Sequence, residues 1–130
     1  MSILAEFIQM LSFEIYCANL LIGWSDLESG DPPMGVAFGR FLPGPGYDQV
    51  QSLVVATSYG DQSALNLSVG VAGRAGPLVC VGGIRLVDLS TELGEEGLSV
   101  EVMGIPYPEY EELFPKHIAE YRELFSPSPE

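Results

Sequence analysis

The sequence predicts a single α+β domain, in which an antiparallel sheet of about five strands is flanked by an N-terminal and a C-terminal helix. Apolar residues alternate with small or polar ones over residues 64–72 and 98–105, which is the period of a strand. Near both ends of the chain they recur instead at three- and four-residue spacings, which is the period of a helix. Short turns join the predicted strands, and short turns connect antiparallel neighbours because a parallel return needs a long crossover.

The N-terminal third is predicted to begin with a helix and to enter the sheet after it. Apolar residues from Ile3 to Leu11 share one helical stripe. Further on, Met34, Val36 and Phe38 alternate with smaller residues and are expected on one face of a strand. The predicted elements are a helix over residues 2–11, a strand over 13–24, a loop over 26–33 and a strand over 34–42.

The middle of the chain is predicted to continue the sheet. Residues 51–59 fit a strand or a buried helix, and their β-branched residues favour the strand. The glycines of GRAG, residues 73–76, predict a tight hairpin turn, after which residues 78–89 return as a strand. Gly82 and Gly83 indicate a bulge or a close approach within it. The residues expected on a common buried face before the turn are Leu65, Leu67, Val69 and Val71.

The C-terminal part is predicted to add one strand and the second helix. A polar turn (STELGEEG) leads into residues 98–105, where Leu98, Val100 and Val102 lie on one side. A helical stripe of apolar residues then runs over residues 110–125. Pro115 interrupts it, so this region forms either two short helices or one that begins near Pro115. The domain is expected to cover residues 1–125, with 126–130 as a frayed tail.

Composition limits the classes of partner. The chain of 130 residues carries 18 acidic and 5 basic residues, a formal net charge of −13, which disfavours nucleic acid and anionic lipid as partners. The apolar N-terminal stretch lacks a basic start and contains Glu6 and Glu14, so neither a signal peptide nor a membrane span is expected and the predicted location is cytoplasmic. The high apolar content and the unalternated runs SLVVA and PLVCV predict apolar surface left for self-association, most simply a twofold homodimer.

Candidate catalytic groups are few. The chain has one histidine, His117, which is expected to be a surface or partly packed residue of the C-terminal helix. Cys17 and Cys80 lie in apolar runs and are expected to be reduced, structural thiols. The protein is therefore predicted not to be an enzyme and to need no cofactor or metal. A small enzyme using carboxylate acid–base chemistry, or a sheet domain that binds a small molecule, remain alternatives.

The strongest binding signal is acidic. Eight carboxylates and no basic residue occur over residues 88–112. Part of this run has an ordinary explanation, because acidic residues favour the start of a helix. Glu92, Glu95 and Glu96 are the predicted contacts for a basic protein partner, with Trp24 as a separate candidate because tryptophan is enriched at binding hot spots. The predicted function is a non-enzymatic, acidic protein-binding or self-associating module, similar in composition alone to secretion chaperones and immunity proteins.

Overall fold

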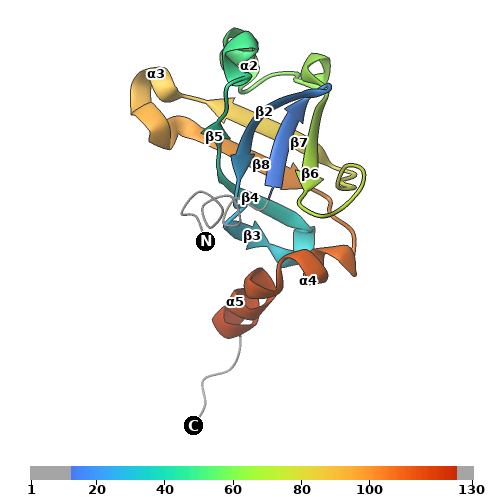
Figure 1. Cartoon of the computed structure of the whole chain (residues 1–130). Coiled ribbons are helices and arrows are strands. Elements are labelled where there is room, and N and C mark those ends of the chain that lie inside the picture. The colour runs from blue at the N-terminus through green and yellow to red at the C-terminus, as the bar shows by residue number, and fades with distance from the viewer. Residues whose placement is uncertain (1–12, 126–130) are drawn as a thin grey trace, which may run out of the picture.

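The computed structural model describes residues 13–125, which form an α+β fold with two antiparallel four-stranded sheets (Figure 1). In sheet A the strand order is β5-β2-β1-β6, and in sheet B it is β3-β4-β8-β7. The strands of sheet A are β1 (Phe13–Cys17), β2 (Leu20–Ser25), β5 (Leu42–Pro43) and β6 (Leu67–Val71). Those of sheet B are β3 (Ser29–Asp31), β4 (Val36–Arg40), β7 (Gly83–Asp88) and β8 (Leu98–Met103).

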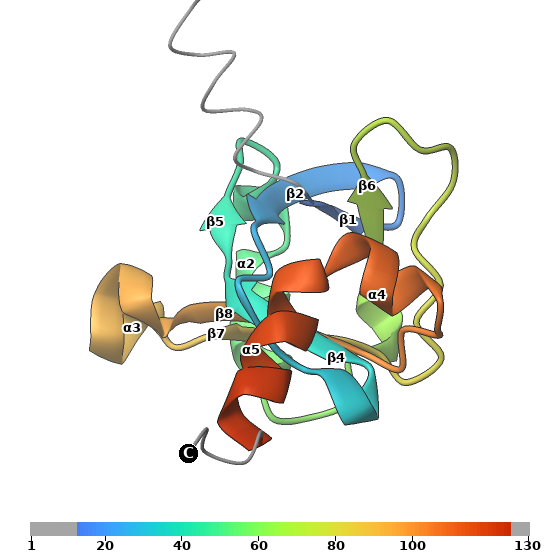
Figure 2. The same cartoon turned by 90° about the horizontal axis from the view of Figure 1, so that it is seen from below.

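The helices are short and lie around the sheets. The C-terminal region forms two short helices, which is one of the two predicted alternatives. Pro115 is the first residue of the second helix, a position where proline is tolerated. Figures 1 and 2 show this last helix running away from the sheets, and so its final residues, Leu124 and Phe125, are exposed. The α-helices are α2 (Gln51–Thr57), α3 (Ser90–Leu93), α4 (Glu109–Leu113) and α5 (Pro115–Phe125). The 3-10 turns are η1 (Pro32–Met34), η2 (Tyr47–Gln49), η3 (Ser63–Leu65) and η4 (Gly94–Gly97).

The two sheets share one hydrophobic core, and this changes the expected architecture. Fully buried side chains come from both sheets, including Ile15 and Val69 of sheet A and Leu86, Val100 and Val102 of sheet B. The α+β class is confirmed, but the strands divide into two sheets that cover each other's inner faces. The C-terminal helical region adds Tyr110 and Phe114 to the same core. The predicted helix over 2–11 and the tail over 126–130 lie outside the described residues.

Two predicted strands are wrong in form. Residues 13–24 form a hairpin and not one strand, because the chain reverses at Ala18, where φ is 53°. Residues 51–59 contain helix α2, in which Val54 is buried while Leu53 and Val55 are each 44% exposed. The run of β-branched residues favours a strand locally, but only one residue per helical turn faces the core here, and that burial decides the conformation.

The GRAG turn is only partly as predicted. Gly73 and Gly76 have positive φ values of 79° and 78°, as the turn requires. The returning chain makes a single bridge, Gly70 with Pro77, and then crosses to sheet B instead of completing a hairpin. Proline cannot donate to a ladder, which limits pairing at this point. Gly82 marks the expected close approach, because a Cβ there would lie 2.9 Å from the Cβ of Met103.

The predicted faces of the clear strands are largely confirmed. Leu98, Val100 and Val102 all face the core. In the segment 65–71, Leu65 and Val69 are buried, and Leu67 and Val71 are half-buried against the same core. Leu65 belongs to η3 and not to the strand. In β4 the core-facing residues are Ala37 and Gly39, which leaves the face that holds Met34, Val36 and Phe38 turned outward.

Candidate functional site

The three predicted acidic contacts lie together at the end of a protruding hairpin. Strands β7 and β8 are joined by α3 and η4, which Figures 1 and 2 show standing away from the body of the protein. Glu92, Glu95 and Glu96 are all exposed there, and Leu93 between them is 59% exposed. We call these four residues the acidic tip. Protein-binding surfaces commonly have an apolar centre and a polar rim, and here an exposed leucine is surrounded by carboxylates.

The base of the acidic tip is fixed by a buried polar network around Asp88. Its Oδ1 accepts hydrogen bonds from the backbone N–H and the hydroxyl of Ser90, both at the start of α3. Its Oδ2 accepts from the hydroxyl of Tyr47 at 2.6 Å and from the amide of Gln51 at 3.2 Å. Burial opposes ionisation of Asp88, but these donors outweigh it and hold its pKa below the ordinary value. The tip is therefore anchored through η2 and α2, and its side chains are free to face a partner.

An open groove of about 380 Å³ borders the acidic tip on the outer face of sheet B. Its lining includes Phe38, Arg40 and two carboxylates, Glu28 and Glu96, so that one residue of the tip also forms a wall of the groove. Phe38 is 42% exposed. Glu28 is held in place because its Oε2 accepts a hydrogen bond from the backbone N–H of Arg40 at 2.9 Å. The groove thus combines an exposed aromatic ring with two carboxylates and one arginine.

Trp24, the fourth predicted contact, is placed on the other sheet. It lies in β2, where it pairs with Glu14 of β1 on one side and with Leu42 of β5 on the other. Its indole packs over Gly44, since a Cβ at that glycine would lie 2.9 Å from the ring. Trp24 is half-buried and lies on the outer face of sheet A. The structure therefore joins three of the four predicted contacts and separates Trp24 from them.

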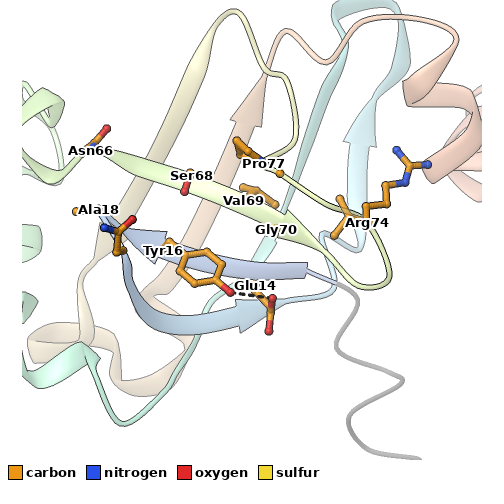
Figure 3. A pocket seen from close by; sticks show the side chains of 12 residues that line it. Glu14, Tyr16, Ala18, Asn66, Ser68, Val69, Gly70, Arg74 and Pro77 are labelled. Atoms are coloured by element: carbon orange, nitrogen blue, oxygen red, sulfur yellow. Dashed lines mark hydrogen bonds between the residues drawn. The ribbon is translucent and has the colours of Figure 1, made fainter.

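A second groove, of about 500 Å³, lies on the outer face of sheet A and was missed by the sequence analysis (Figure 3). Glu14 and Tyr16 of β1 line it together with Ser68 and Gly70 of β6, which pair with them across the ladder. The hydroxyl of Tyr16 donates to Oε1 of Glu14 at 3.0 Å, and this bond raises the pKa of Tyr16 above its ordinary value. Alternating polar residues on both strands were the available signal, but recognising it required the pairing of β1 with β6.

The wall of the sheet A groove is closed by the loop after β6. Arg74 of this loop turns its guanidinium away from Glu14 and toward α4, as Figure 3 shows. It contacts Glu109 at 3.2 Å and Glu112 at 3.9 Å. Two of the acidic residues at the start of α4 therefore have an ion-pair partner, in addition to their favourable position at a helix N-terminus.

The residues considered for catalysis are placed apart from both grooves. His117 is buried against Phe114, with ring centroids 4.9 Å apart, and its Nε2 lies 2.8 Å from the carbonyl oxygen of Leu27. It is thus a packing residue with more burial than expected. Cys17 and Cys80 are free thiols, and burial raises the pKa of both. Within residues 13–125, no cluster of three or more His, Cys, Asp or Glu residues is placed to hold a metal ion.

Comparison of the chain with protein-family models, with curated proteins and with solved structures gave no match. No helix within residues 13–125 is long and apolar enough to cross a membrane.

Proposed function

We propose that this protein is a non-enzymatic module that binds a basic protein partner through the acidic tip and the adjoining Phe38 groove. The observation that carries the proposal is Leu93, an apolar side chain exposed at the end of a projecting hairpin and surrounded by three exposed glutamates. Burial of such a leucine in a partner's pocket is favourable, and the carboxylates then select a positively charged rim. The net charge of −13 extends the same preference over longer range.

The anchoring of the tip supports a binding role over simple solubility. A loop that serves solubility alone has no need of a fixed conformation, whereas a pre-organised loop loses less entropy when it binds. Here Asp88 ties the start of α3 to Tyr47 and Gln51, and the backbone N–H of Leu89 bonds the carbonyl of Gly97 at 2.9 Å across the hairpin. The four tip residues thus project from a rigid base.

The proposal is tested with a fluorescein-labelled peptide of alternating lysine and leucine, whose binding is followed by fluorescence anisotropy. We expect the affinity to fall about tenfold or more between low and high salt, because exposed charges are screened beyond about 10 Å at 0.1 M ionic strength. The double charge reversal Glu95→Lys with Glu96→Lys should slow association, and Leu93→Ala should speed dissociation.

A matched variant separates binding at the tip from binding by net charge. Glu120 and Glu123 are exposed on α5, away from the tip. Their double reversal to lysine changes the net charge by the same amount and should leave most of the affinity intact. If this variant lowers the affinity for the peptide as strongly as the tip variant does, the acidic residues act through net charge alone and the assignment to the tip is wrong.

We also propose that the module self-associates as a twofold dimer in the cytoplasm. The cytoplasmic location is proposed from the sequence alone, because its apolar N-terminal stretch lacks a basic start and carries Glu6 and Glu14. The two runs that motivated self-association lie in α2 and in the loop before β7, where Leu53, Val55, Val79 and Val81 are exposed and not covered by a second sheet face. Sedimentation equilibrium at micromolar concentration should give a mass twice the 14.0 kDa of one chain. A monomer across that range overturns the dimer and leaves the tip proposal untouched.

A further inference from the structure

The sheet A groove has a chemistry different from that of the acidic tip. Its floor and walls carry a carboxylate, a phenol ring, a hydroxyl and amide groups, supplied by two paired strands and the loops next to them. We propose that this groove binds a guanidinium or ammonium group, which the carboxylate of Glu14 holds beside the ring of Tyr16. Its volume of about 500 Å³ is in the range of small-molecule sites, which is roughly 300–1,000 Å³.

Glu14 and Tyr16 are positioned together by the strand and by their own hydrogen bond. They are two residues apart in β1, so their side chains leave the same face of the sheet. The bond from the Tyr16 hydroxyl to Oε1 of Glu14, 3.0 Å long, fixes the carboxylate beside the ring (Figure 3). An ionised carboxylate has about four acceptor positions, and this bond uses one of them. No residue within 13–125 is seen to donate to the others, which are available to an N–H donor from a ligand.

Gly70 keeps the space above the sheet open at this point. It pairs with Glu14 across the ladder. A Cβ at this position would lie 3.2 Å from the Tyr16 ring and 3.4 Å from Oε1 of Glu14, so any side chain would enter the place between the two groups. Its φ is not in the left-handed region, and an alanine there fills the groove without straining the backbone.

The charges around the groove select a cation. Arg74, the positive residue of the lining, has its guanidinium bound by Glu109 and Glu112 and turned toward α4. Glu14 therefore carries the uncompensated charge of the lining. A cation there gains a charge-assisted hydrogen bond from the carboxylate and an electrostatic attraction to the face of the phenol ring.

Trp24 lies next to this site in the sheet without lining it. It is the cross-strand partner of Glu14 in β2, but its ring packs over Gly44 and it is not among the residues that line the groove. The aromatic face of the site is therefore that of Tyr16. A planar guanidinium stacks on an aromatic face while donating to a carboxylate, which makes it the best match to Tyr16 and Glu14.

The test follows backbone amide shifts of the full chain by NMR during titration with N-acetyl-arginine amide. N-acetyl-citrulline amide, which has nearly the same shape but no charge, is the matched ligand control. We expect the arginine probe to shift residues of β1 and β6 around Glu14, Tyr16 and Gly70, and the citrulline probe to leave them unchanged. A parallel titration with n-butylguanidinium, which carries the same single charge and no peptide groups, distinguishes the source of the cation: tighter binding than the arginine probe favours a free small molecule, and weaker binding favours a protein side chain.

Variants make the assignment specific. Glu14→Gln should lower the affinity for the arginine probe about tenfold. Glu120→Gln makes the same change of charge on α5 and should leave that affinity unchanged. Tyr16→Phe, which keeps the ring, should bind within about threefold of the original, and Tyr16→Leu should bind less well. Gly70→Ala should weaken binding without altering any charge. Equal shifts from the citrulline probe, or unchanged affinity in both Glu14→Gln and Gly70→Ala, would overturn the proposal.

Discussion

The hydrogen bond from Tyr47 to Asp88 gives the sharpest test of how the tip is anchored. Tyr47 is buried, and its hydroxyl lies 2.6 Å from Oδ2 of an ionised, buried carboxylate. In Tyr47→Phe the ring remains packed against Phe41, with centroids 5.1 Å apart in the native protein, so the change removes the hydroxyl alone. A hydrogen bond to a charged group contributes about 1.5–3 kcal/mol, and we expect the free energy of unfolding to fall by that amount at pH 7.

The pH dependence of this effect carries a definite sign. The donors hold the pKa of Asp88 below its ordinary value in the folded protein. Such a group stabilises the fold above the unfolded pKa of about 3.9, and the contribution is lost as the pH falls through the lower, folded pKa. Removal of the Tyr47 donor raises that folded pKa. The difference between Tyr47→Phe and the original protein should therefore shrink as the pH falls through the folded pKa of the variant and then through the lower one of the original, toward the roughly 0.5–1.5 kcal/mol of a neutral hydrogen bond.

Urea denaturation followed by the fluorescence of Trp24 measures both quantities, at a series of pH values. Tyr59→Phe is the matched control, because Tyr59 is 80% exposed and its loss of a hydroxyl should change the unfolding free energy by less than about 0.5 kcal/mol. A Tyr47→Phe effect below 0.5 kcal/mol at pH 7, or one that is the same at pH 3 and pH 7, would refute the role of the hydroxyl as a donor to an ionised Asp88.

Four further substitutions test the packing. Gly23→Ala should lower the free energy of unfolding by at least about 1–3 kcal/mol, because a Cβ there would lie 2.6 Å from the ring of Phe41. A melting temperature within about 1 °C of that of the original protein would contradict this. Leu65→Ala should lower the free energy of unfolding by about 2–5 kcal/mol, and Leu67→Ala should lower it distinctly less because that side chain is only half-buried. If urea denaturation gives the reverse order, the assigned burial is wrong. His117→Ala should cost about 2–4 kcal/mol in the same assay through lost stacking and a lost hydrogen bond, and a cost below 1 kcal/mol would exclude a packing role.

The sequence predicted local structure well where one face of an element is buried. The alternation at Leu98, Val100 and Val102 identified β8, and the helical stripe identified the C-terminal helical region, although Pro115 left one helix or two as alternatives. It failed where neighbouring apolar residues face different environments. In α2, Val54 is buried while Val55 is exposed, and no periodicity in a short run reveals that difference.

The division into two sheets depended on contacts that are distant in the chain. Strand β1 pairs with both β2 and β6, so residues 13–17 meet residues 67–71, and the sheet A groove arises from that pairing. Loop length and alternation do not specify which strands meet, because both sheets contain antiparallel neighbours of the same kind. Glu92, Glu95 and Glu96 were found without this information, since they are close together in the sequence as well as in space.

In the acidic tip, the side chains proposed to contact a partner are separate from the groups that fix its conformation. Its four side chains are exposed, while the groups that hold it, such as Asp88, Tyr47 and Ser90, lie beneath it. Exposed substitutions away from special features usually change stability by less than about 0.5 kcal/mol. The tip sequence can thus diverge during evolution, or be exchanged by design, with little effect on whether the chain folds. If the tip binds a partner as proposed, its specificity can change one residue at a time while the scaffold stays the same.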